Sequence, residues 1–351
     1  MRRATLLGTT FAFLLIAAPA MACGGLVAPG GTVQLVRTTT LSAYVDGVEH
    51  YITSFEFAGA TGEFGSIVPL PGVPTDVGKA GRWTLQRLLQ EVQPPVPQAL
   101  FEADGAARAA AGVDILQRHE VGALDILILK GGGRDVARWA GEHGFELSDD
   151  APEVLEFYSK RSPIFAAARF NAERAAAKGL EVGDGTPIHF AVPTDDPWIP
   201  LRILALAKPA DEVVKADLFL LTERRPALLP QPSTPLLRLP NEVDGLKVRR
   251  SEEASRLLLE DLSSDRGMGW LPTSGMWLTY LRLSERAGDL TYDLATDVTG
   301  TTPSAVDAGL AFPEPPRVPG SFPVWPVAVV MGVALLGAAV AERARSPRPA
   351  A

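Results

Sequence analysis

The sequence predicts an α+β fold, in which a mixed, largely antiparallel β-sheet exterior domain with packed helices precedes one C-terminal transmembrane helix. Two observations predict it. Short segments rich in β-branched and aromatic residues alternate irregularly with segments whose apolar residues have helical spacing. A run of nineteen uncharged residues then stands near the end of the chain, at 323–341. We therefore expect one large domain, or two intimately packed halves, over residues 23–310.

The first part of this domain has the composition of β-structure. Asp46-Gly47 lies between two apolar segments and is a typical hairpin turn pair. The prolines from Pro69 to Pro74 are expected to end the sheet, because proline cannot donate to a strand ladder. The four strands expected here are 33–38, 41–45, 51–57 and 64–68.

The central part mixes helical and extended patterns. Trp83, Leu85, Leu88 and Val92 have helical spacing, and Asp150 with Pro152 is typical of a helix start. The segment 164–178 is helical in composition, although its first half also fits a strand. We expect helices at 81–92, 97–111, 134–143 and 150–159, and strands at 113–118, 123–129, 187–192, 201–207 and 217–222.

The last part of the domain follows a proline-rich connector at 226–240. A helix is expected at 251–261, and strands at 276–282 and 290–294. Residues 311–322 then form a proline-rich linker to the apolar run.

The N-terminus has the pattern of a secretory signal over residues 1–22. Two arginines precede an apolar run too short for a membrane span, and Ala20-Met21-Ala22 is a small-residue cleavage pattern. Cleavage after Ala22 makes Cys23 the first mature residue. Ordinary cleavage is the favoured interpretation, and lipidation of Cys23 and an uncleaved anchor stay open as alternatives.

The apolar run at 323–341 predicts a transmembrane helix. As a helix it is about 28 Å long, close to the hydrocarbon thickness of a bilayer. Arg343, Arg345 and Arg348 follow it, and the positive-inside rule then places the tail 342–351 in the cytoplasm and the bulk of the chain outside. The expected localisation is a single-pass protein of the cell membrane. A buried core helix is the alternative.

Charge and cysteine content exclude some classes of protein. The 33 basic residues include five outside 23–322 and the 41 acidic residues include one, so the exterior carries a net charge of −12. A surface of that sign repels phosphate backbones, and no nucleic-acid partner is expected. The single cysteine, Cys23, excludes an intramolecular disulfide.

No motif in the chain names a reaction. Lys130-Gly131-Gly132-Gly133 has neither a P-loop ending nor the glycine spacing of a dinucleotide site, so a turn is the favoured interpretation. The four histidines, His50, His119, His143 and His189, are far apart in sequence and show no metal-binding spacing. Asp195-Asp196 before Pro197 fits a turn better than a calcium loop. No cofactor, no metal and no recognisable catalytic residue is predicted.

Several blocks together resemble a known family. They are Cys23-Gly24-Gly25 after the export signal, the segment from Phe64 to Pro74, the segment from Trp139 to Leu147, and Trp198-Ile199-Pro200-Leu201-Arg202-Ile203. Over most of residues 23–225 the chain resembles domain of unknown function 2330, an uncharacterised family of bacterial exported proteins. The resemblance implies an exported bacterial protein and carries no activity with it.

Three functional hypotheses follow from these observations. The favoured one is a non-catalytic envelope or cell-surface binding module, with the C-terminal helix in the membrane and a protein or glycan partner in the envelope. The second is an exported hydrolase whose carboxylates are brought together only by the fold. The third is an accessory subunit of a membrane complex.

Overall fold

The computed structural model describes residues 26–27, 34–58, 65–92, 113–177 except 144 and 146, 187–232, 243–300 and 302–312. The predicted signal peptide, Cys23, the helix at 97–111, the linker beyond residue 312, the membrane helix and the basic tail lie outside these ranges. Within them, no helix is both long and apolar enough to cross a membrane.

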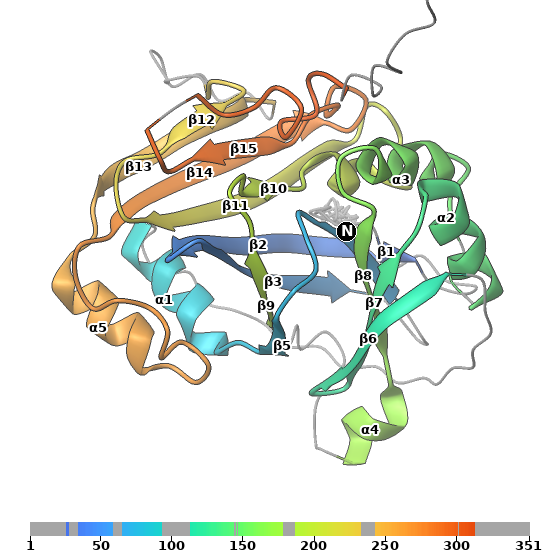
Figure 1. The fold of residues 1–351 in the computed structure, drawn as a ribbon, viewed down its shortest axis with the longest axis horizontal. Coiled ribbons are helices and arrows are strands. Elements are labelled where there is room, and N and C mark those ends of the chain that lie inside the picture. Colours follow the sequence, from blue (N-terminus) through green and yellow to red (C-terminus); the bar gives the residue numbers. More distant parts are fainter. Residues whose placement is uncertain are drawn as a thin grey trace, which may run out of the picture. The chain divides into compact units, whose positions relative to one another are not determined.

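A seven-stranded sheet forms the centre of the described domain (Figure 1). Its hairpin turns at Asp46 and Gly47, whose φ values of 51° and 79° match a type I′ turn, as the sequence predicts. The β11–β2 pair is parallel and the others are antiparallel. The strand order is β13 (Gly245–Glu253), β14 (Trp277–Arg286), β11 (Val213–Thr222), β2 (Gln34–Val45), β3 (Val48–Ala58), β9 (Ile188–Pro193) and β5 (Asp76–Lys79).

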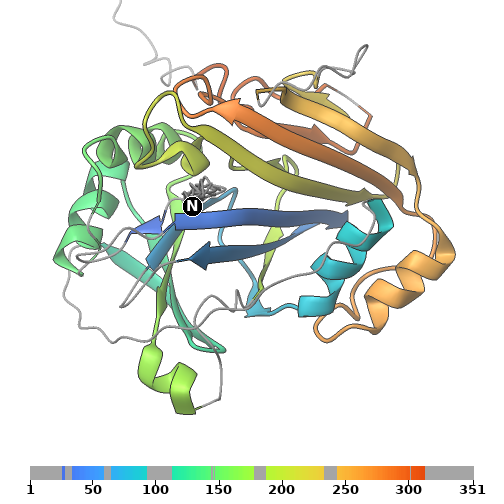
Figure 2. The ribbon, with the colours of Figure 1, turned by 180° about the vertical axis from the view of Figure 1, so that it is seen from behind.

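A five-stranded antiparallel sheet forms a second layer (Figure 2). Between its strands β7 and β8 the chain forms two helices, α2 (Gly133–Glu142) and α3 (Ala151–Ser159), which pack on each other. The short helix α4 (Ala172–Ala177) follows the middle strand of the sheet. The strand order is β1 (Leu26–Val27), β4 (Gly65–Leu70), β8 (Ile164–Phe170), β7 (Leu124–Lys130) and β6 (Asp114–Val121).

A small third sheet has the order β10 (Trp198–Ile199), β15 (Leu294–Asp297) and β12 (Ala227–Leu229). The 3-10 turn η1 (Arg202–Ala205) follows β10 directly. Two further helices, α1 (Arg82–Val92) and α5 (Arg256–Ser264), cover one face of the large sheet.

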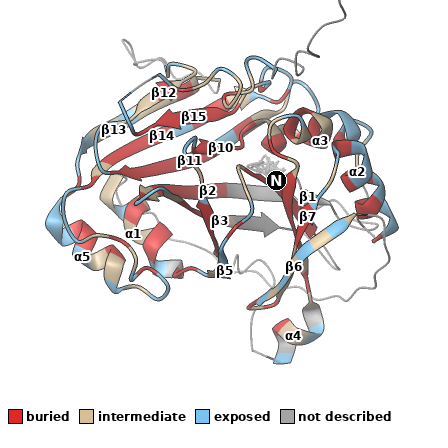
Figure 3. Cartoon of the chain, in the orientation of Figure 1, coloured by how far each residue is buried: buried red, intermediate tan, exposed pale blue. Residues whose placement is uncertain are grey.

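Strand alternation divides the core into two parts, one on each face of the large sheet (Figure 3). Leu41, Ile52 and Phe219 face α1 and α5. Tyr51 and Phe190 face the opposite way, into the core that the five-stranded sheet shares. The large sheet therefore separates two apolar cores, one on each of its faces.

The structure corrects several sequence expectations. The expected strands 33–38 and 41–45 are one strand, β2. Pro69 does not end the sheet but pairs with Phe165 inside β4. Within the described residues, β4 is paired at Pro69 only with β8, and proline is tolerated where a strand is paired on one side.

The remaining corrections concern the second half of the chain. The first half of 164–178 is strand β8, which is buried between two neighbours. The expected strand at 201–207 is the turn η1. The helix expected at 251–261 begins later, after Ser255, because 245–253 pairs with β14. The strand expected at 290–294 begins only at Leu294 and ends at Asp297.

Candidate functional site

An open pocket of about 190 Å³ lies between the β9–β10 turn and the end of β15. Four carboxylates line it, together with hydroxyl groups of Thr and Ser residues and two prolines. They are Asp195, Asp196, Asp297 and Asp307, with Thr296, Thr299, Thr302 and Ser304, and with Pro197 and Pro303. We define these residues as the acidic pocket.

The first wall of the acidic pocket is fixed to the β2–β3 hairpin. The hydroxyl of Tyr44 donates to the carbonyl of Thr194 at 2.9 Å, and the amide of Thr194 donates to the carbonyl of Gly47 at 3.2 Å. The amide of Asp196 in turn donates to the hydroxyl of Thr194 at 3.2 Å. The Asp195-Asp196 turn predicted from sequence therefore has a second role, because its side chains line a pocket.

The second wall is built from two local turns. One oxygen of the Asp297 carboxylate accepts bonds of 2.7 Å from both the amide and the hydroxyl of Thr299. The hydroxyl of Ser304 accepts from the amide of Val306 at 3.1 Å, which sets the turn that carries Asp307. These bonds fix the Asp297 carboxylate and the turn that precedes Asp307.

The other carboxylates of the acidic pocket raise the cost of ionising Asp196. Desolvation at the pocket wall, followed by the negative charges of Asp307, Asp195 and Asp297, raises the pKa of Asp196 above its ordinary value. A cation in the pocket would relieve this repulsion. The arrangement therefore favours a positively charged ligand group.

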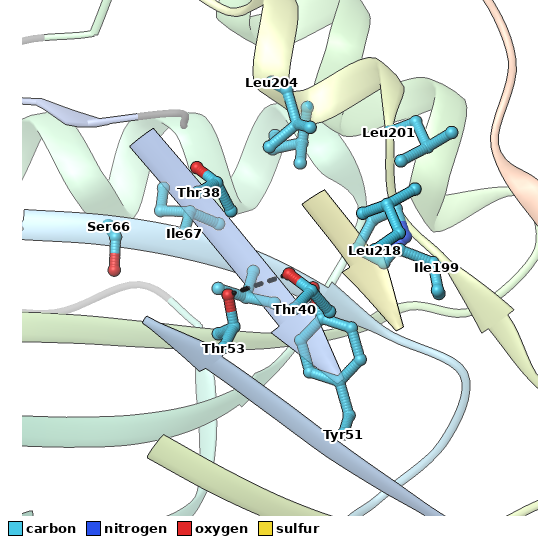
Figure 4. Close-up of a pocket in the computed structure, with 13 residues that line it drawn as sticks. Thr38, Thr40, Tyr51, Thr53, Ser66, Ile67, Ile199, Leu201, Leu204 and Leu218 are labelled. Carbon is cyan, nitrogen blue, oxygen red and sulfur yellow. Dashed lines mark hydrogen bonds between the residues drawn. The ribbon is translucent and has the colours of Figure 1, made fainter. Parts of the chain in front are cut away.

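A second cavity, between the two large sheets, is too small for a ligand (Figure 4). Its volume is about 10 Å³, at the lower limit for one water molecule. Thr40 and Thr53 point into this region from neighbouring strands, and their hydroxyl oxygens lie 3.3 Å apart. It is a small gap in the core, lined mostly by apolar residues beside these hydroxyls.

The proline-flanked block Trp198–Ile203 is held by a buried polar network. The Asp293 carboxylate accepts from the amides of Leu201 at 2.6 Å and Arg202 at 2.9 Å, and it pairs with the guanidinium of Arg161. The hydroxyl of Tyr158 accepts from the amide of Ile203 at 2.8 Å. One of the sequence blocks that carry the family resemblance is thus held in place by this buried network.

One buried acid stands apart from this network. Glu49 is fully buried on β3, where the hydroxyl of Ser42 donates to its Oε1 at 2.7 Å. Burial raises the pKa of Glu49 to about 7, against the opposing effects of the hydrogen bonds from Ser42 and from the backbone of Trp198. The Asp46-Gly47 hairpin predicts that Ser42 and Glu49 lie on paired strands, but the sequence does not show that Glu49 is fully buried.

The fold joins two of the four histidines. Pairing of β3 with β9 places Nδ1 of His50 2.9 Å from Nε2 of His189, and the ring of Trp270 stacks on His50 at 3.6 Å between ring centroids. His119 bonds Gln117, and His143 bonds the carbonyl of Trp139. Within the described ranges, no three His, Cys, Asp or Glu residues could together hold a metal ion.

The glycine run after β7 serves helix packing. A Cβ on Gly133 would lie 2.0 Å from the backbone nitrogen of Glu156, so only glycine lets α2 approach α3 this closely. The amide of Gly131 donates to the carbonyl of Pro163 at 3.0 Å, and Asp135 places a carboxylate in the first turn of α2. These contacts agree with the expected turn.

The remaining site residues predicted from sequence lie outside the described ranges. They are Ala22 and Cys23 at the cleavage site, and Arg343, Arg345 and Arg348 in the tail. They stay predictions.

Solved structures of a baculovirus protein show a distant likeness. The crystal structure of baculovirus P35 aligns with 11% sequence identity and a TM-score of 0.40, covering 77% of this chain and 97% of that one. A mutated P35 after caspase cleavage aligns with 9% identity and a TM-score of 0.36, covering 75% and 99%. TM-scores this low carry no conclusion about this chain.

No curated protein matches the chain. A family profile does match, over residues 17–228 and thus more than half of the sequence. Its description is an uncharacterized protein conserved in bacteria, DUF2330. The chain belongs to the DUF2330 family.

Proposed function

We propose that this protein is an exported, membrane-anchored binding module of the bacterial envelope. In this proposal the exterior domain takes up a basic side chain of a protein partner in the acidic pocket. The signal pattern ending at Ala22 and the apolar run before Arg343 support the location. The four carboxylates of the pocket support the ligand, and this is the observation that carries the proposal.

The pocket fits a Lys or Arg side chain better than it fits a metal ion. Its volume of about 190 Å³ exceeds what one bare cation fills, and two prolines and several hydroxyls line it together with the carboxylates. An ammonium or guanidinium group would donate hydrogen bonds to several of these carboxylates at once. A neutral glycan would leave the mutual repulsion at Asp196 in place.

The test is binding of a short oligolysine peptide to the full chain, measured by calorimetry at low and moderate salt. Asp196→Asn should weaken binding, because it removes a pocket charge. Asp211→Asn is the matched control, because it changes the net charge equally. Asp211 is exposed and lies just before β11, at the end of that strand away from the pocket. Equal affinity of the two variants would reject the proposal.

A carboxylate-dependent hydrolase is the second candidate. It is favoured by the raised pKa of Asp196 beside other carboxylates, since a general acid needs such an environment. Release of soluble fragments from isolated cell-wall polysaccharide would support it if Asp196→Asn abolished the release. If the unaltered protein binds the oligolysine peptide but releases no fragments, the hydrolase is rejected and the binding module is retained.

A further inference from the structure

Two exposed apolar side chains mark the point where the chain leaves the described domain. Leu310 is 52% exposed and Phe312 is 59% exposed, whereas large apolar residues elsewhere in the described domain are mostly buried. The two lie on one short segment that follows β15 and lies beside α3 (Figures 1 and 2). They are separated by one residue in the sequence, so one short segment exposes both.

This segment is held in a fixed conformation. The amides of Leu310 and Ala311 both donate to the carbonyl of Ala305, at 2.8 and 3.0 Å, and Gly309 supplies the positive φ of 68° that the turn requires. The ring of Phe312 stands edge-on to that of Phe157, with centroids 6.5 Å apart. The apolar side chains are therefore presented to solvent by a built turn.

A positive charge accompanies them. The ammonium of Lys160, an exposed residue, lies 4.8 Å from the centroid of the Phe312 ring. An aromatic ring beside a lysine is a typical combination at a membrane surface, where the ring enters the headgroup layer and the ammonium meets phosphate.

The sequence keeps this feature close to the predicted anchor. Ten residues, 313–322, separate Phe312 from the apolar run, and they span at most about 35 Å when fully extended. A tether of that length gives the lipid surface a high effective concentration near Leu310 and Phe312.

We propose that Leu310, Phe312 and Lys160 form a membrane-contact surface for the phosphate-bearing headgroups of the bilayer that anchors the chain. The proposal rests on the membrane anchor of the proposed function. Two apolar side chains are too few for a stable protein interface, which buries about 800 Å² per partner. They suffice for a shallow contact that the tether supports.

The test uses the full chain reconstituted in vesicles of phosphatidylethanolamine and phosphatidylglycerol. Cys23→Ser removes the native thiol, and Ala311→Cys then carries an environment-sensitive fluorophore between the two apolar side chains. Leu257→Cys is the matched control position, because Leu257 is 66% exposed on α5. We expect the fluorophore at position 311 to show a blue-shifted emission and to be quenched by lipids that are spin-labelled near the headgroup. The fluorophore at position 257 should show neither effect.

Variants separate the contact from the anchor. Leu310→Ser with Phe312→Ser should abolish both effects at position 311, and Lys160→Glu should reduce them, while flotation with the vesicles stays unchanged. A chain that floats but gives the same signal at 311 and 257 overturns the membrane contact alone. A chain that does not float overturns the anchor as well. A blue shift at position 311 that appears in intact cells but not in vesicles would assign the surface to a protein partner and overturn the proposal.

Discussion

The hydroxyl of Tyr158 donates a hydrogen bond of 2.8 Å to the buried carboxylate of Asp293, although 135 positions separate the two residues. Tyr158 lies in α3, inside the segment that matches the family, and Asp293 lies beyond it. The last third of the chain thus completes the core that holds the Trp198–Ile203 block.

Asp293→Ala should destabilise the domain by about 3–5 kcal/mol, because it leaves the buried guanidinium of Arg161 without its carboxylate. Tyr158→Phe removes one hydroxyl from the same network and should cost about 1–3 kcal/mol. Urea unfolding followed by circular dichroism measures both. Similar stability of Asp293→Ala and the parent protein would contradict the proposed role of the network.

Glu49→Gln should stabilise the domain at alkaline pH. The folded protein holds the pKa of Glu49 at about 7, above its ordinary 4.5, so the group favours the fold fully below pH 4.5 and loses that contribution as pH rises through 7. This difference in pKa between the unfolded and the folded protein lowers the free energy of unfolding by about 3 kcal/mol at pH 8. Melting temperatures of the two proteins at pH 5 and pH 8 test it, and a pH-independent difference would refute it.

His50→Gln should reduce the sensitivity of the domain to acid. Burial, followed by the charge of His189, lowers the pKa of His50 to about 3, while an unfolded chain takes up the proton near pH 6.5. The unfolded state therefore gains protons first as pH falls below 6.5, and the fold loses stability until the folded pKa is reached. The variant's melting temperature should fall less between pH 7 and pH 4. His119→Gln, on β6, is the control.

Gly133→Ala should destabilise the domain, because its Cβ would meet the backbone nitrogen of Glu156 at 2.0 Å and force α2 away from α3. The expected cost is about 1–3 kcal/mol. Gly141→Ala in the same helix adds a methyl group where no atom lies within 4 Å, and it should be neutral or stabilise by up to about 1 kcal/mol. Chemical unfolding of the pair tests the packing role of Gly133, and an equal effect of both substitutions would exclude it.

Local signals in the sequence were sufficient for elements whose cause is local. The Asp46-Gly47 hairpin needs only two residues that tolerate positive φ, and the helix α3 needs only Pro152 in its first turn and apolar spacing. The capping role expected of Asp150 is wrong, because its side chain makes no capping hydrogen bond. The prediction of a strand at 201–207 is wrong. The hydrogen bonds that hold this segment as a turn come from Asp293 and Tyr158, which are far away in the sequence.

The sequence by itself determined the α+β class, the family resemblance, the acidic charge and the prediction of an exported, anchored chain, because composition and runs of like residues are properties of neighbours. Only the tertiary structure decided that Asp195 and Asp196 share a pocket with Asp297 and Asp307, that His50 meets His189, and that Glu49 is buried. Those relationships depend on which strands pair across long sequence separations, and residue spacing does not encode strand pairing.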